Sequence, residues 1–204
     1  VAGQLKRLGV SPSALGVAYV NARENLLLSH KDSKQLFGSL FTLSQQTNRP
    51  WEETYRNYSN SLSVISRYGQ EAPAVFRKMS TAAVHTGIAY DTLMSFIESH
   101  DSYRTAARAA NKLNAVLGGR YLDPVRLLAA KGGDKARVIA EAFRLANVSI
   151  QDLHPKAARM VKGNFGITAE TFVQLSEMDL TGYEASLGET LKPPSDNEFL
   201  SVLK

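Results

Sequence analysis

The segment GIAYDTLMSFIESHDSYRTAARAANKLNAVLGG, residues 87–119, decides the fold because it predicts two helices in series. Gly87 ends a preceding helix, and apolar residues then recur at helical spacing. Asp101 and Ser102 are both residue types that cap a helix N-terminus, and a second periodic run follows them. The Gly118–Gly119 pair ends this second helix, because glycine adopts the left-handed conformation that a C-cap needs.

The second helix has two distinct faces. Residues spaced three, four or seven apart form an apolar stripe that predicts the buried face: Ala106, Ala109, Ala110, Leu113, Val116 and Leu117. Small side chains in this stripe allow a neighbouring helix to approach closely. A basic row lies on another face, formed by Arg104, Arg108 and Lys112, with Arg120 and Arg126 beyond it. Such a row is typical of an exposed helix face, and it is also our candidate for contact with a polyanion.

The composition narrows the class of protein. A chain of 204 residues, 44% of them hydrophobic, can bury the core of one ordinary domain or two small ones. It has no cysteine, which excludes disulfides and thiolate zinc sites. No apolar run approaches the roughly 20 residues that span a membrane. The formal net charge of +5 is spread along the chain, whereas a dedicated nucleic-acid-binding protein usually concentrates its excess in one patch.

Capping residues and prolines divide the rest of the chain into further short helices. Helix starts are predicted at Ser11–Pro12, Asp32 or Ser33, Pro50, Pro73, Asp123–Pro124, Asp134, Ser149 or Pro155, and Thr168. No window shows the alternation of a strand bounded by hairpin turns. The sequence therefore predicts an all-α fold, a bundle of about ten short helices with no sheet.

We assign residues 1–180 to a helical domain and residues 181–204 to a linker or extended tail. The helical signal fades near Thr181, and Pro193–Pro194 cannot continue a helix.

Residue types that carry catalysis or bind metals form no pattern of known chemistry. None of the histidines is paired at helical spacing with a second ligand; these are His30, His85, His100 and His154. We expect His100 to be a surface or helix-cap histidine. There is no G-x-S-x-G elbow and no phosphate-binding loop. We therefore expect no catalytic residue, no cofactor and no metal site, and a protein that is not an enzyme.

Two other groups of side chains have structural explanations. Glu52 and Glu53 follow Pro50 in the first turn of a predicted helix, where acidic residues complement the helix dipole. The aromatic residues Trp51, Tyr55 and Tyr58 share one face of that helix, which favours packing against another helix over stacking on bases.

Residues 96–119, FIESHDSYRTAARAANKLNAVLGG, resemble a segment of the tail tape-measure proteins of tailed bacteriophages. The typical pattern there is an aromatic-Asp-Thr-aromatic turn, a helix of small residues, and a K-L-N-A-hydrophobic-L-G-G ending. This chain has H-D-S-Y at 100–103 and K-L-N-A-V-L-G-G at 112–119, and it departs from the pattern at His100. The resemblance implies a packing and turn motif made of Asp101, Tyr103, Ala106, Ala110, Leu113, Asn114, Leu117, Gly118 and Gly119.

The resemblance implies a structural virion protein, a module of a tape-measure-like protein that acts in tail assembly, length determination and genome delivery. One continuous helix of this length would reach only about 300 Å, so we expect a piece of a longer chain. The implied partners are other tail proteins (tube, baseplate hub or tail tip) and further copies of the chain, such as a trimer. The implied location is the virion tail, after assembly in the host cytoplasm.

The alternative is a basic helical protein of the virion interior, or an ejection protein, that binds nucleic acid. Its contact with DNA would use the basic row of Arg104, Arg108 and Lys112.

Overall fold

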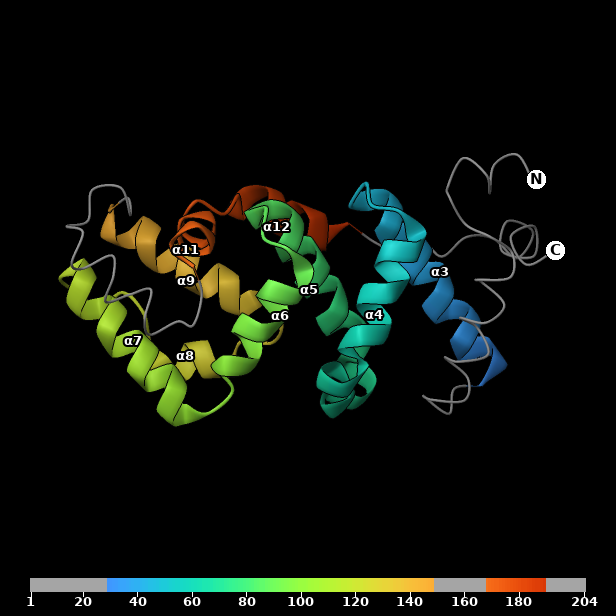
Figure 1. Cartoon of the computed structure of the whole chain (residues 1–204), viewed down its shortest axis with the longest axis horizontal. Coiled ribbons are helices and arrows are strands. Elements are labelled where there is room, and N and C mark those ends of the chain that lie inside the picture. Colours follow the sequence, from blue (N-terminus) through green and yellow to red (C-terminus); the bar gives the residue numbers. More distant parts are fainter. Residues whose placement is uncertain (1–28, 149–167, 190–204) are drawn as a thin grey trace. The chain divides into compact units, whose positions relative to one another are not determined.

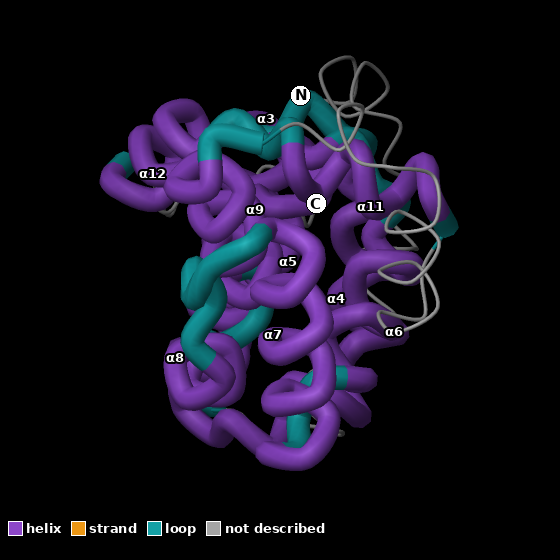
Figure 2. The backbone as a smooth tube through the Cα atoms, turned by 90° about the vertical axis from the view of Figure 1, so that its left-hand side faces the viewer, coloured by secondary structure: helices purple, strands orange, loops and turns teal. Residues whose placement is uncertain are grey.

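The computed structural model describes residues 29–148 and 168–189, and every regular element in these ranges is a helix (Figures 1 and 2). This confirms the predicted all-α class. The helices in chain order are α3 (His30–Gln46), α4 (Trp51–Ile65), the 3-10 helix η1 (Ser66–Glu71), α5 (Ala72–Thr86), α6 (Tyr90–Ser99), α7 (Tyr103–Leu117), α8 (Pro124–Ala129), α9 (Asp134–Ala146), α11 (Ala169–Ser176) and α12 (Leu180–Gly188). The helices predicted from Ser11–Pro12 and from Ser149 or Pro155 lie outside the described residues, as does the Pro193–Pro194 part of the predicted linker.

Most of the predicted helix starts coincide with observed ones. Pro73 lies in the first turn of α5, and the Asp123 side chain caps α8 by accepting from the Val125 amide at 2.9 Å. The Thr168 side chain caps α11 in the same way. The prediction that Asp134 caps a helix is wrong, because Gly133 holds the N-cap position and Asp134 is the first helical residue.

The chain separates into two compact units, Val1–Leu62 with Glu189–Lys204 and Ser63–Gly188. In the first unit, aromatic rings of α3 and α4 form the described core. The Phe37 ring lies 5.7 Å from the Trp51 ring and 6.0 Å from the Tyr55 ring, and the Trp51 and Tyr55 rings stack at 6.1 Å. Trp51 and Tyr58 are almost fully buried. The predicted packing role of this aromatic face is therefore confirmed.

Helices α5 and α9 are central to the second unit. Helix α5 packs against η1, α6, α9 and α12, and α9 packs against α5, α8, α11 and α12 (Figure 1). Close approach is achieved where small residues meet: Ala82 and Ala83 of α5 are buried, and a methyl group added at Gly133 would collide with the Lys78 carbonyl of α5. The start of α9 therefore lies directly against the backbone of α5.

Residues 181–188 are helical, which corrects their predicted place in a linker. Helix α12 contains two glycines and its apolar residues do not fall on one face, and this is why its helical signal is weak in the sequence. Its anchor is Tyr183, which is fully buried and donates a hydrogen bond to the Asp134 carboxylate at 2.9 Å. Burial and the neighbouring Asp134 charge raise the pKa of Tyr183 well above its usual value. Asp134 also pairs with Lys78 at 2.6 Å, so this carboxylate links α5, α9 and α12.

No helix in the described part of the chain is both long enough and apolar enough to cross a bilayer.

Candidate functional site

Helix α7, the second helix of the segment 87–119, begins with a reciprocal pair of hydrogen bonds. The Thr105 amide donates to the Ser102 hydroxyl over 3.2 Å, and the Ser102 amide donates to the Thr105 hydroxyl over 3.3 Å. This is a capping box with threonine in the position usually held by glutamate or glutamine. Of the two N-cap types predicted here, Ser102 caps the helix, which leaves the Asp101 carboxylate for other contacts.

The Asp101 carboxylate lies between two cations from distant parts of the chain. One oxygen pairs with Lys135 of α9, and the other pairs with Arg67 of η1. Lys135 is only 1% exposed, and its ammonium also donates to the carbonyls of Ile97 and His100 over 3.3 and 3.1 Å. These carbonyls end α6, where the helix dipole favours a cation. Lys135 therefore ties the end of α6 and the start of α7 to α9.

Burial controls the proton affinity of both basic groups at this junction. Burial lowers the pKa of Lys135, and the hydrogen bond and charge of Asp101 oppose that effect. Burial also lowers the pKa of His100 below its usual value of 6.5, against the hydrogen bond to the Phe96 carbonyl. Hydrogen bonds to neighbouring protein groups, rather than to water, therefore satisfy the polar atoms of Lys135 and His100.

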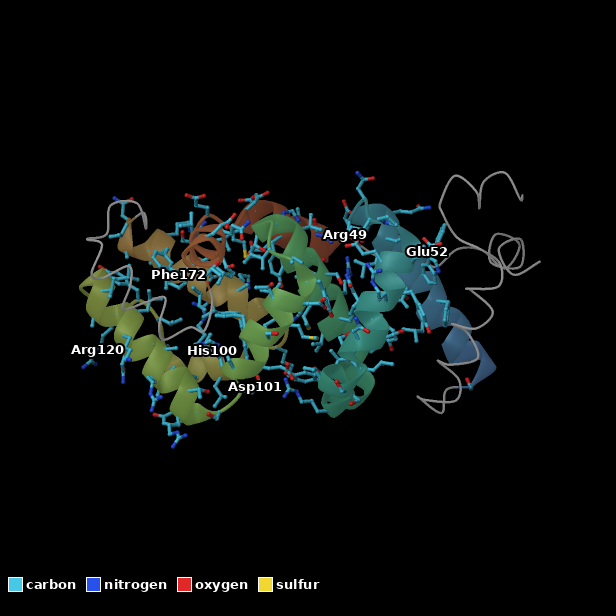
Figure 3. The ribbon with its side chains drawn as sticks, in the orientation of Figure 1. Arg49, Glu52, His100, Asp101, Arg120 and Phe172 are labelled. Atoms are coloured by element: carbon cyan, nitrogen blue, oxygen red, sulfur yellow. The ribbon has the colours of Figure 1, made fainter. Side chains whose placement is uncertain are left out.

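His100 is predicted to be either a surface or a helix-cap residue. It is the C-cap of α6, and it is buried. It is 2% exposed, and its ring centre lies 4.7 Å from the Phe96 ring. Its Nδ1 lies 2.8 Å from the Phe96 carbonyl oxygen and 2.8 Å from the Ser99 hydroxyl. Figure 3 shows His100 and Asp101 side by side where α6 passes into α7. Their contacts fix the turn between the helices.

The apolar stripe of α7 is buried except at Val116, which is half-buried. Ala106, Ala110 and Leu113 are 0% exposed, and Leu117 is 7% exposed. Tyr103, which the resemblance places in the packing motif, is 60% exposed and lies outside the core. It precedes Ala106 by one turn, and the face of α7 becomes covered only from Ala106 onward. Tyr103 is therefore not one of the packing residues of α7.

The other end of α7 is held by a single side chain. The Asn114 amide group donates to the Leu122 carbonyl over 2.8 Å, and its oxygen accepts from the amides of Tyr121 and Leu122 over 2.9 and 2.8 Å. Gly118 caps the helix with a left-handed conformation, φ 75°, which allows this reversal. A methyl group at Gly119 would lie 2.6 Å from the Tyr121 ring. Asn114 thus binds the segment that returns from the glycine pair toward α8, and α8 packs against α7.

The exposed face of α7 is basic. Arg104 and Arg108 are exposed and form no ion pair with the described residues, whereas Lys112 is half-buried on the flank of the row. The sequence of α7, YRTAARAANKLNAVL, contains no acidic residue. Of the two arginines beyond the helix, Arg126 pairs with Glu141 of α9. Arg120 is exposed, and it lies at the end of α7 remote from Asp101 (Figure 3).

A groove adjoins the basic face at the C-terminal end of α7. Its volume is about 410 Å³, and its lining includes Asn111 and Asn114 of α7, Arg120 and Tyr121 of the turn, and Asp123 at the start of α8. Asp123 uses one carboxylate oxygen to cap α8. The apolar side chains Leu122, Pro124 and Val138 also line the groove, so its lining is mixed, and Arg120 and Arg126 are its cationic groups.

A second polar cluster, which the sequence does not indicate, joins α5 to α12. His85 Nε2 lies 3.0 Å from the Ser186 hydroxyl, and His85 Nδ1 lies 3.5 Å from the Asp179 carboxylate. A carboxylate, an imidazole and a hydroxyl thus follow one another as they do in a Ser-His-Asp catalytic triad. However, the Asp179 side chain is 61% exposed, and its other oxygen accepts from the Gly182 amide at the start of α12. Ser186 lies within α12, where its own amide takes part in helical hydrogen bonding and is not offered to an oxyanion.

The same residues account for the docking of α12. The Asp179 amide donates to the His85 carbonyl over 3.2 Å, and Arg77 of α5 donates to the Ser186 carbonyl over 2.7 Å. Sequence reasoning misses the cluster because His85 and Ser186 are 101 residues apart. Local patterns carry no information about such a separation.

Comparison of the chain with protein-family models, curated proteins and solved structures finds no match. Within residues 29–148 and 168–189, no three histidine, aspartate or glutamate side chains gather closely enough to hold a metal ion. The function is therefore inferred from the residues of α7 and their geometry.

Proposed function

We propose that this chain is a non-enzymatic structural module of a tape-measure-like protein in the tail of a bacteriophage virion, where it acts in tail assembly, length determination and genome delivery. The observation that carries the proposal is the Asn114 contact set. The contacts in this fold explain why leucine, asparagine and glycine occur where they do in the K-L-N-A-hydrophobic-L-G-G pattern. Leu113 and Leu117 are buried, Asn114 makes three hydrogen bonds to the returning segment, and the glycine pair makes the turn.

These distinct structural roles of leucine, asparagine and glycine support a structural element shared with the tape-measure proteins rather than a mere similarity of composition. Asparagine is an unfavourable residue in a helix interior, because its amide competes with the backbone for hydrogen bonds. Here that amide binds the backbone of the segment that follows the glycines. A protein that needed only a helix at this place would gain stability from alanine or leucine at position 114.

The start of the segment supports the same interpretation. Asp101, the acidic residue of the turn in the phage pattern, is used in a buried ion pair with Lys135 that joins three helices. Every polar group that the resemblance singles out, apart from exposed Tyr103, thus stabilises a junction. The partners proposed on this basis are the tail tube, baseplate hub or tail tip, together with further copies of the chain, with a trimer as the expected assembly.

The test is the location and copy number of the chain in purified particles. A peptide tag is placed on the chain, tails are separated from heads and from free cytosolic protein, and the chain is quantified by mass spectrometry against the tail-tube subunit. Recovery with tails at about three copies per particle would support the proposal. Recovery only in the free cytosolic fraction would overturn it, and recovery with heads would favour an internal or ejection protein.

A further inference from the structure

The arginines of α7 form a row along one side of the helix. At 3.6 residues per turn, Arg104 and Arg108 are about 40° apart around the helix axis and about 6 Å apart along it. Asn111 lies within about 60° of both, one turn nearer the groove. Arg120 lies beyond the end of the helix and lines the same groove as Asn111. Two exposed cations and an amide therefore share one side of α7, and a third cation lies at the groove next to its C-terminal end.

Within the described residues, no carboxylate pairs with the arginines of this row. Arg104, Arg108 and Arg120 have no ion-pair partner there, although several other cations of the same unit are paired closely. Arg126 pairs with Glu141, and Lys135 pairs with Asp101. Because α7 contains no acidic residue, no carboxylate of this helix offsets the charge of Arg104 and Arg108, and an external anion can do so.

The chemistry of the row favours phosphates over a membrane surface. A helix that binds a bilayer buries apolar side chains in it, but the apolar stripe of α7 is already buried in the fold. The exposed face holds Arg104, Arg108 and Asn111. The exposed ring of Tyr103 lies at the start of the helix, about 100° around its axis from Arg104, so the row itself offers no succession of rings on which unpaired bases could stack. Tyr121 in the groove lies against Gly119, and its ring is only partly exposed. The row therefore suits the regular phosphate backbone of a duplex more than a single strand.

We propose that the α7 row, made of Arg104, Arg108, Asn111 and Arg120, binds the phosphate backbone of double-stranded DNA without reading its sequence. Arginine donates paired hydrogen bonds to phosphate oxygens, and amide side chains also contact them. The proposal does not rest on the assignment to a tail, because it concerns contacts of this chain with DNA in solution.

The experiment measures fluorescence anisotropy of a labelled 30-base-pair duplex with the full chain, over a range of salt concentrations. The double variant Arg104→Gln/Arg108→Gln is compared with Arg56→Gln/Arg144→Gln. This control removes the same charge from two exposed arginines on α4 and α9. Each lost phosphate contact reduces the slope of log K against log salt by about 0.9, so the test variant should lose about 1.8 from the slope and bind at least about tenfold more weakly at low salt.

The outcomes separate the proposal from its competitors. A slope and affinity that fall in the α7 variant and stay near wild type in the control would support it. Equal losses in both variants would overturn it, because they would indicate attraction by net charge alone. Absence of duplex binding, or binding only to vesicles of anionic lipid, would also overturn it. Tighter binding to a single strand that is lost in Tyr103→Ala would overturn the duplex assignment in favour of base stacking.

Discussion

Replacement of Asn114 by alanine tests the element on which the proposed function depends. The change removes three hydrogen bonds and leaves the buried Leu122 backbone without those partners. At about 1 kcal/mol for each hydrogen bond, less about 0.6 kcal/mol gained from the higher helix propensity of alanine, the segment after α7 should lose about 2.4 kcal/mol. That loss corresponds to about 60-fold less protection against local opening.

Hydrogen exchange of the full chain, followed by mass spectrometry of peptides that cover residues 119–127, measures this loss directly. The amides of Tyr121 and Leu122 are themselves donors to Asn114, so they report on the contact at once. Asn111→Ala is the matched control, because Asn111 is an exposed asparagine on the same helix. It should leave protection unchanged within about threefold. A change in Asn114→Ala no larger than in the control would refute the assigned role of Asn114.

Three further predictions concern the buried junction and the polar cluster at α12. Lys135→Met should destabilise the chain by about 1.5–3 kcal/mol in urea denaturation, because it removes the buried donor to Asp101 and to the carbonyls that end α6, while Arg67 still pairs with Asp101. Arg67→Gln, at the more exposed pair, should cost no more than about 1 kcal/mol. Similar losses in both variants would contradict the assigned burial of Lys135. Burial lowers the pKa of His100 in the folded chain, so the unfolded chain binds a proton at this residue more readily. The free energy of unfolding should therefore fall as the pH is lowered from 7 to 5, and His100→Gln should reduce this dependence. An identical pH profile in the variant would count against the assigned burial of His100. Wild type and Ser186→Ala should hydrolyse p-nitrophenyl acetate no faster than buffer does, and faster hydrolysis by wild type alone would show that the triad-like cluster is active.

Local signals in the sequence were sufficient for most of the helix boundaries. Ser102, Asp123 and Thr168 cap helices because a short polar side chain can bond an amide two or three residues along the chain. The buried stripe that includes Ala106 and Leu113 follows from helical periodicity alone. These features depend on residues within a few positions of one another, and for this reason they could be predicted without knowledge of the fold.

The sequence could not reveal contacts that depend on the packing of distant helices. Lys135 resembles an ordinary surface lysine at the start of a helix, and only the arrangement of α6, α7 and α9 buries it against Asp101. Asp134 has the pattern of an N-cap, but Tyr183 and Lys78 bind its carboxylate instead. These residues had no local signal that would have separated them from exposed residues of the same type.

Asn114 is an intermediate case. Its position near the end of a helix, followed by two glycines, was a usable signal, because an unfavourable helical residue is often retained for a hydrogen bond outside the helix. The K-L-N-A-V-L-G-G pattern at 112–119 contained the residue, but its partners could be identified only from the structure.

The most direct test of the proposed structural role in the tail is electron cryomicroscopy of purified tails that carry the chain. The proposal predicts density inside the tail tube or at its tip that fits α7, the Asn114 turn and α8 as one unit, in threefold arrangement. Tails of normal length and infectivity that lack this density, from a phage in which the coding sequence has been deleted, would contradict it.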